Sequence, residues 1–294
     1  MTQSLVGEPP KSYNFVVSIK PWEELMQNEG LEGNGADVTR AADRWARQLA
    51  EWALPNELIA SAPESPWILS PNSFTPSITP PDTESYRRAL EVAALGGSVL
   101  DVGAGRGAAS LCLVPPATEL ICVDQSESML ASLHDDAAGL GLNVRTVLGN
   151  WLEVADAVPE VDLVLCHHVL YNVADLGNFI RLLDEHARHR VVIEITYKHP
   201  LSWLNPLFEH FHGITRPDRP NALDALEVIA EVGINAELEI FESAPRRNQS
   251  PVLIVQQARR QLCLDPTFDS ELSGLIKASP TRQIACIWWD RHRQ

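Results

Sequence analysis

The stretch VLDVGAGRGAAS, residues 99–110, sets the fold class of this chain. An apolar run passes into a loop that contains Gly103, Gly105 and Gly107, and small helix-forming residues follow. Because glycine has no Cβ, the backbone N–H groups of such a loop can approach a ligand closely. The order of strand, glycine loop and helix start therefore predicts a ligand-binding loop in an α/β fold.

Two kinds of ligand fit the glycine spacing. Gly103, Gly105 and Ala108 match the G-x-G-x-x-G/A fingerprint of dinucleotide-binding proteins. Asp124 follows about 20 residues later, where an acid would bind a ribose hydroxyl. Asp101 favours the second kind of ligand, because a carboxylate at the end of the strand repels a pyrophosphate and attracts ammonium and sulfonium charges.

With this acid in front of its glycines, the stretch resembles motif I of the class I S-adenosylmethionine-dependent methyltransferases, which reads acid-x-G-x-G-x-G. The acid of that motif lies near the methionine part of the cofactor. The resemblance implies that Asp101, Gly103 and Gly105 bind S-adenosylmethionine. It also implies an α/β fold with a doubly wound, seven-stranded, mostly parallel Rossmann-like sheet.

Two further strand ends are similar to the pattern of this family. Asp124 stands where the family has the acid that accepts the ribose hydroxyls, and Gln125 follows it. Met129, on the next predicted helix, would either pack against adenine or belong to the core. Asn150 and Trp151 stand where the family usually has an acid and an apolar residue that contact adenine. The amide oxygen of Asn150 can still accept a hydrogen bond from the adenine amine.

The fourth predicted strand ends in VDLVLCHHVLYN, which resembles the lining of the methyl-transfer site in small-molecule methyltransferases. His167, His168 and Tyr171 are the candidate catalytic residues. A free imidazole, with a pKa of about 6.5, can take a proton from a hydroxyl or an amine. Each histidine could instead bond to the backbone and only shape the pocket. We expect Cys166 to contact the cofactor. The D/N-P-P-Y/F motif of enzymes that methylate base amines or glutamine is absent.

Alternating helix and strand patterns from residue 83 onward predict the parallel sheet. The strands are expected at 99–102, 120–124, 144–148, 162–167, 191–196, 236–241 and 283–289. Ser250 and Pro251 predict the N-cap and first turn of an additional helix before the last strand. Residues 83–294 would form the S-adenosylmethionine-binding core, with insertions near 199–222 and 245–278.

Residues 1–82 are expected to form a helical appendage whose proline-rich part, residues 55–81, is a lid or a linker. Trp67 and Phe74 in that part would either cover the ligand or pin the segment to the core. Before it, residues 36–54 predict an amphipathic helix. Its apolar face would consist of Ala42, Trp45, Leu49 and Trp52.

Other polar residues have weaker implications. His210 and His212 would project from different sides of a helix, so their spacing does not favour a metal site, and no metal is expected. Glu194, inside the fifth predicted strand, could border the active site or make a simple buried hydrogen bond.

The composition limits which partners and which cellular compartment are expected. A formal charge of −16 opposes binding to phosphate backbones, so no nucleic-acid partner is expected. Five cysteines without a C-x-x-C pair suggest free thiols in a reducing compartment. Without a signal-like start or an apolar run of membrane-spanning length, we expect a cytoplasmic protein with no membrane partner.

These observations predict an enzyme that transfers a methyl group from S-adenosylmethionine to a small-molecule acceptor by in-line displacement. The alternatives are an RNA or protein methyltransferase and a non-catalytic S-adenosylmethionine-binding regulator on the same fold. Asp101 argues against a nicotinamide-dependent oxidoreductase. The acceptor, the atom methylated and the oligomeric state do not follow from the sequence.

Overall fold

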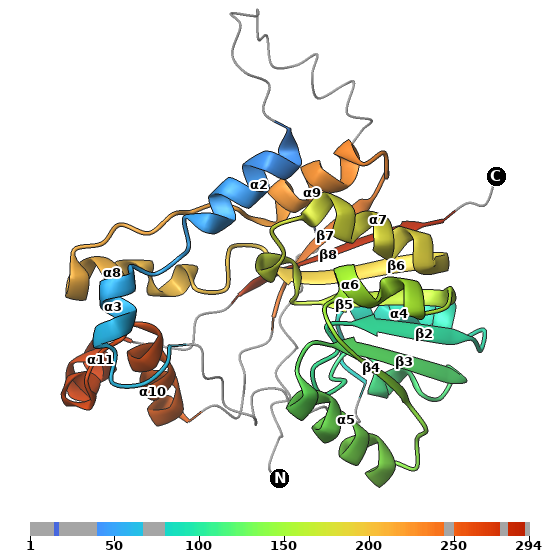
Figure 1. The fold of residues 1–294 in the computed structure, drawn as a ribbon, viewed down its shortest axis with the longest axis horizontal. Helices are drawn as coiled ribbons and strands as arrows, with labels where there is room; N and C mark the ends of the chain where they lie inside the picture. The colour runs from blue at the N-terminus through green and yellow to red at the C-terminus, as the bar shows by residue number, and fades with distance from the viewer. Residues whose placement is uncertain (1–14, 18–39, 67–79, 244–249, 277–281, 292–294) are drawn as a thin grey trace, which may run out of the picture.

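The computed structural model describes residues 15–17, 40–66, 80–243, 250–276 and 282–291. A β-sheet lies at the centre of the molecule (Figure 1). Within those ranges it has eight strands in the order β1-β7-β8-β6-β5-β2-β3-β4. The strands are β1 (Phe15–Val17), β2 (Ser98–Val102), β3 (Glu119–Asp124), β4 (Arg145–Leu148), β5 (Val161–His167), β6 (Ala187–Thr196), β7 (Glu237–Glu242) and β8 (Gln283–Asp290). β8 is antiparallel to β6 and β7, and β1 is antiparallel to β7, whereas the remaining pairs are parallel.

The seven strands from β2 to β8 confirm the sheet predicted from the sequence, and with it the doubly wound, mostly parallel fold class. β6 begins at Ala187, four residues before its expected start at Val191. β1 was not predicted, because three residues are too few to show a strand pattern in a sequence. It pairs with the outer edge of β7.

Helices cover both faces of the sheet. The helices of the described ranges are α2 (Ala41–Ala50), α3 (Asn56–Ser61), α4 (Glu84–Ala93), α5 (Glu127–Gly139), α6 (Trp151–Val154), α7 (Leu176–His186), α8 (Asn205–His212), α9 (Ala222–Glu231), α10 (Pro251–Gln261) and α11 (Asp269–Leu275). α4 and α5 share one hydrophobic core with the sheet, and α2, α7 and α9 share the core on its other face. Alternating residues of β5 divide between the two: Leu165 belongs to the first core and Val164 to the second.

α2 is the amphipathic helix predicted in the N-terminal region, and Trp45 anchors it. The Trp45 side chain is fully buried, its ring stacks on Tyr171 with 5.6 Å between centroids, and its Nε1 donates to the carbonyl oxygen of Val173 at 2.8 Å. Arg40 and Glu231 form an ion pair at 2.9 Å at the start of the helix. α2 is therefore part of the main core.

Replacing Trp45 with alanine is expected to lower the free energy of unfolding by about 3–5 kcal/mol, because a large buried aromatic ring and its hydrogen bond are lost together. Urea unfolding followed by circular dichroism measures the change. Leu148→Ala is the control, since that side chain is 54% exposed and its loss should change stability by no more than about 0.5 kcal/mol. Equal losses in the two variants would show that α2 is only loosely attached.

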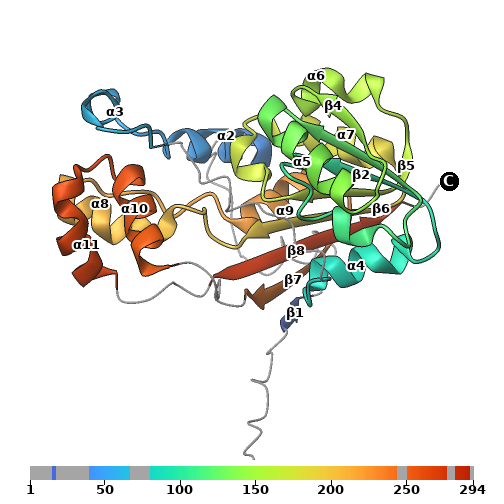
Figure 2. The same cartoon turned by 90° about the horizontal axis from the view of Figure 1, so that it is seen from below.

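A separate group of helices, α3, α8, α10 and α11, forms what we call the helical lobe (Figures 1 and 2). It lies beyond the carboxyl end of β6, from which the chain continues through residues 197–204 into α8. Both predicted insertions meet there: residues 199–222 contribute α8, and residues 245–278 contribute α10 and α11. The buried side chains of the lobe are Leu54, Leu204, Leu207, Phe208, Val255, Ala258, Leu262, Cys263, Leu264 and Leu272.

Of the helices in this lobe, the sequence predicted α10 but not α3. α10 begins at Pro251 with Ser250 as its N-cap residue, which confirms the predicted additional helix. The proline content of residues 55–81 did not predict α3, which begins directly after Pro55. Trp67 and Phe74 lie outside the described residues.

The five cysteines are all buried and free. Burial raises the pKa of each thiol, that of Cys112 to about 11. Across the described ranges, no helix has the length and apolar character needed to cross a bilayer.

Candidate functional site

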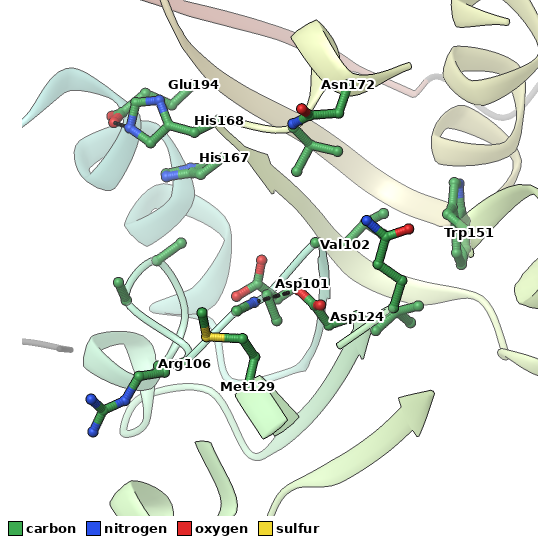
Figure 3. Close-up of a pocket in the computed structure, with 18 of the residues that line it drawn as sticks. Asp101, Val102, Arg106, Asp124, Met129, Trp151, His167, His168, Asn172 and Glu194 are labelled. Carbon is green, nitrogen blue, oxygen red and sulfur yellow. Dashed lines mark hydrogen bonds and ion pairs between the residues drawn. The ribbon is translucent and has the colours of Figure 1, made fainter. Parts of the chain in front are cut away.

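A pocket of about 550 Å³ opens at the carboxyl ends of the parallel strands, and we call it the main pocket. Its volume lies within the range of about 300–1,000 Å³ that is usual for small-molecule sites. Asp101 and Asp124 lie between Trp151 on one side and His167 with Glu194 on the other (Figure 3). The predicted cofactor residues other than Cys166 and the predicted histidines therefore border one cavity.

The glycine loop forms the floor of the main pocket. Gly103, Gly105 and Gly107 all have positive φ angles, of 74°, 53° and 80°. A Cβ on Gly103 would collide with Val169, but a Cβ on Gly105 would meet no protein atom within 4 Å. Gly105 therefore faces open space, and the loop leaves room for a ligand against its backbone.

Asp101 is buried beneath this loop, with a relative exposure of 1%. Its Oδ2 accepts a hydrogen bond from the hydroxyl of Ser110 at 2.6 Å. Burial raises the pKa of Asp101 to about 7, against the lowering effect of the Ser110 bond and with a further rise from the charge of Asp124. The carboxyl group is therefore divided between its neutral and charged forms near neutral pH, and a cation bound nearby would favour the charged form.

Asp124 lies at the end of β3 and holds the loop in place. Its Oδ2 accepts from the backbone N–H of Gly105, and its Oδ1 accepts from that of Ser126, both at 2.8 Å. Gln125 and Met129 line the same pocket, and Met129 is only half-buried. The predicted ribose and adenine residues on this strand end thus border the cavity.

Asn150 and Trp151 also line the main pocket, and both have protein contacts of their own. The Asn150 Oδ1 accepts from the backbone N–H of Leu152 at 3.1 Å, as the N-cap of α6. The Trp151 ring is 4% exposed and lies edge-on to His186, with 4.8 Å between centroids. Only a small part of this ring therefore reaches the cavity.

His167 and His168 meet Glu194 where β5 ends beside β6. The register of the two strands places His167 opposite Glu194. The Nε2 of His168 lies 3.2 Å from the Glu194 Oε1, and the hydroxyl of Ser85 donates to the Glu194 Oε2 at 2.6 Å. His168 has a φ of 60°, an uncommon conformation for a residue other than glycine that is found at functional sites. Its backbone N–H donates to the Glu194 carbonyl oxygen at 2.6 Å and holds this turn.

The charge states of Glu194 and His167 differ. Burial alone would raise the pKa of Glu194, but the hydrogen bonds from His168 and Ser85 help to lower it to about 2. Glu194 is therefore an anion at neutral pH. Burial lowers the pKa of His167 more than the nearby Glu194 charge raises it, so this imidazole is neutral. The Nε2 of His167 has no hydrogen-bond partner among the described residues.

Two predicted site residues lie elsewhere. The Tyr171 hydroxyl donates to the carbonyl oxygens of Thr196 and Tyr197, at 2.8 and 3.2 Å, and Tyr171 does not line the main pocket. Burial also raises the pKa of this hydroxyl. Cys166 is fully buried in the core, because successive residues of a strand point to opposite faces and its neighbour His167 takes the pocket side. The structure therefore contradicts a catalytic contact by Tyr171 and a cofactor contact by Cys166.

The roles of two residues of the site, Glu194 and Ser85, do not follow from the sequence. The sequence indicates two alternative roles for Glu194 and contains no signal for Ser85. Their positions depend on the pairing of β5 with β6 and on the packing of α4, which no local pattern reveals.

The histidines of the helical lobe bond to protein groups. The His210 Nε2 lies 2.9 Å from the Glu271 Oε1, and the His212 Nε2 lies 2.7 Å from the carbonyl oxygen of Leu262. In the part of the chain that the structure describes, no three metal-ligating side chains converge.

Comparisons with known proteins agree with this geometry. The model of a family described as "Methyltransferase domain" matches residues 99–190. An uncharacterized protein of Haemophilus influenzae is 30% identical over 212 residues, which cover 67% of this chain and 77% of that protein. The ubiquinone biosynthesis O-methyltransferase of Azorhizobium caulinodans is 35% identical over 92 residues, 31% of this chain and 36% of that enzyme.

The fold has a matching counterpart among solved structures. A candidate methyltransferase from Bacillus halodurans aligns with a TM-score of 0.50 and 16% identity over 71% of this chain and 98% of that protein, a likeness that concerns the fold alone. The family match covers the glycine loop, both strand-end acids and the paired histidines. The chain belongs to the class I S-adenosylmethionine-dependent methyltransferases, and S-adenosylmethionine is its cofactor.

Proposed function

We propose that this enzyme transfers the methyl group of S-adenosylmethionine to a nucleophilic atom of a small molecule bound beside His167, His168 and Glu194. The observation that carries the proposal is the continuity of the main pocket, which joins the glycine loop to these three side chains. A methyl donor and an acceptor can therefore occupy one cavity. Proximity alone can lower the barrier of such a reaction by about 7–11 kcal/mol.

The cofactor half of the pocket has the groups that this ligand needs. S-adenosylmethionine supplies an electrophilic methyl group when bound. We assign Asp101 to its ammonium group, with Gly103 and Gly105 as the close-approach loop, and Asp124 to the ribose hydroxyls. We assign the adenine side of the pocket to Gln125, Met129, Asn150 and Trp151.

We assign His168 as the group that accepts the proton of the acceptor. Its Nε2 faces Glu194, which leaves Nδ1 for the acceptor, and the Glu194 carboxylate stabilises the imidazolium that forms. Burial disfavours the charged form of His167, so we assign its unpartnered Nε2 to a hydrogen bond that orients the acceptor.

The charge of the chain and the name of a relative support a small acceptor over a nucleic acid. The chain carries a formal charge of −16, and carboxylates line the main pocket. Both features oppose the approach of a phosphate backbone. The matched relative from Azorhizobium is named for ubiquinone biosynthesis, which is small-molecule chemistry.

Two measurements test the proposal. S-adenosylhomocysteine should raise the melting temperature, and NAD at the same concentration should not, because only a ligand of the native state stabilises it. The enzyme should then transfer a labelled methyl group into the small-molecule fraction of a metabolite extract. Label in bulk tRNA or rRNA at about 50 mM salt, with none in small molecules, would contradict the proposed acceptor class. Binding without any transfer would indicate a regulator.

The raised pKa of Asp101 predicts how cofactor affinity depends on pH. Below pH 7 the protonated carboxyl group attracts a cation weakly, so the affinity for S-adenosylhomocysteine should increase with pH and level off above about 7. Calorimetric titrations from pH 5.5 to 8 measure this. Asp101→Asn should remove the dependence and bind weakly throughout.

The same group predicts a trend in stability. Because the folded-state pKa of Asp101 lies above its unfolded value of about 3.9, the folded protein binds the extra proton between about pH 4 and 7. Its contribution to the free energy of unfolding therefore decreases as the pH rises through that interval. An Asp101→Asn variant with an unchanged pH profile of unfolding would contradict the assignment.

A further inference from the structure

A second hollow of about 290 Å³ adjoins the carboxyl end of β6. Residues 196–200 line it from the end of that strand, Ser202 and Trp203 from the start of the helical lobe, and Arg282 and Gln283 from the start of β8. We call it the basic hollow. Its lining thus joins the end of β6 and the start of β8 to the residues that lead into α8.

The charge of the basic hollow is opposite to that of the main pocket. Among the described residues that line it, Lys198 and Arg282 are basic and none carries a carboxylate. The main pocket is lined by Asp101, Asp124 and Glu194, and Arg106, which also lines it, is paired with Asp136 at 2.8 Å. In a chain with a charge of −16, a hollow whose described lining includes Lys198 and no acid favours an anionic ligand.

Lys198 is the residue most available to such a ligand. It is exposed, and it forms no side-chain ion pair or hydrogen bond among the described residues. The hydroxyl of Ser202 and the indole of Trp203 border the same space. An ammonium and a hydroxyl donate to carboxylate or phosphate oxygens, and the ring supplies an apolar wall for the rest of the molecule.

Contacts with Trp52 and Tyr171 hold the walls of the basic hollow. The Trp52 ring stacks on His199 with 3.7 Å between centroids, and its Nε1 donates to the carbonyl oxygen of Arg219 at 2.6 Å. Burial and the nearby Arg216 lower the pKa of His199 to about 3, so this ring adds no charge. The Tyr171 hydroxyl holds the backbone at residues 196 and 197. The hollow is therefore formed before a ligand arrives.

We propose that the basic hollow binds a carboxylate or phosphate group of the methyl acceptor, with Lys198 as its specificity-determining residue. This inference rests on the proposed function. Glu194 lines the main pocket, and Thr196, two residues further along the same side of β6, lines the hollow, a separation of about 7 Å along a strand. One elongated acceptor can thus place its nucleophile near His168 and its acidic end near Lys198.

Anion binding is tested on the full chain labelled with 5-fluorotryptophan, whose Trp203 resonance is assigned with Trp203→Phe. Inorganic phosphate and acetate are titrated separately, against sodium chloride at equal ionic strength, so that the two anions are distinguished. Phosphate or acetate should shift the Trp203 resonance, and Lys198→Met should weaken that binding by about tenfold or more. Lys198→Arg should restore it. Arg181→Met, which removes an exposed positive charge on α7, should have no effect.

The link to methyl transfer is tested with the same variants. Acceptors from a metabolite extract should be retained on an anion exchanger, and Lys198→Met should methylate them about tenfold more slowly with unchanged affinity for S-adenosylhomocysteine. If neither anion shifts Trp203, or if Lys198→Met and Arg181→Met behave alike, the inference is wrong. If anions bind but no methyl group is transferred to any small molecule, the proposed function fails and the hollow remains an anion site without its assigned role.

Discussion

Asp124→Ala is expected to weaken the binding of S-adenosylhomocysteine by about 100-fold, which corresponds to about 2.7 kcal/mol. The variant loses the carboxylate assigned to the ribose hydroxyls, and hydrogen bonds to a charged group contribute about 1.5–3 kcal/mol each. It also frees the backbone N–H of Gly105, so the glycine loop loses the bond that holds it toward the pocket. Isothermal titration calorimetry measures the affinity.

Asp135→Ala is the matched control for this experiment. Asp135 is an exposed carboxylate on α5 that does not line the main pocket, so its removal changes the net charge equally and should leave the affinity unchanged. Circular dichroism should show that both variants remain folded. Wild-type affinity in Asp124→Ala would refute the assignment of the ribose site to the end of β3.

His168→Ala is expected to reduce the rate of methyl transfer by a factor of about 10² to 10⁴, the usual contribution of a general base, with cofactor affinity unchanged. Glu194→Gln keeps the size of the side chain but removes the anion that stabilises the His168 imidazolium. It should therefore lower kcat more than it changes the KM of the acceptor.

His134→Ala serves as the control, because His134 is an exposed histidine on α5 far along the chain from the paired histidines. Single-turnover rates with the acceptor found in the extract screen provide the comparison. Full activity in His168→Ala would move the role of base to another group, whereas a loss of cofactor affinity in the same variant would place His168 in the cofactor half of the pocket.

The cofactor half of the site was predictable because its signals are local. Asp101 and the glycines lie within seven residues of each other, and Asp124 ends the next strand along the chain. In a parallel sheet, the carboxyl ends of successive strands meet at one edge, so motifs at these strand ends are sufficient to place the cofactor site. The same reasoning gave the seven strands β2 to β8 but not β1, whose three residues pair with β7 from more than 200 residues away.

The acceptor half was less predictable, because its contacts join distant segments. Glu194 reaches His168 only through the register of β5 and β6, and Ser85 reaches Glu194 from α4. Tyr171 lies four residues after His167, but the short turn Leu170–Asn172 directs its hydroxyl to the end of β6 and away from the main pocket. The union of two insertions into one helical lobe is likewise a tertiary event that neither segment shows alone.

Because its natural thiols are buried, this protein can be labelled selectively at an introduced surface cysteine. None of the five natural cysteines offers an exposed thiolate, so a cysteine introduced on the surface should react selectively with a maleimide dye or a nitroxide label. Val252 on α10 and Leu140 at the end of α5 are 61% and 40% exposed. A donor and an acceptor dye at these two positions would report the distance between the helical lobe and the sheet domain in solution, with all native cysteines left in place.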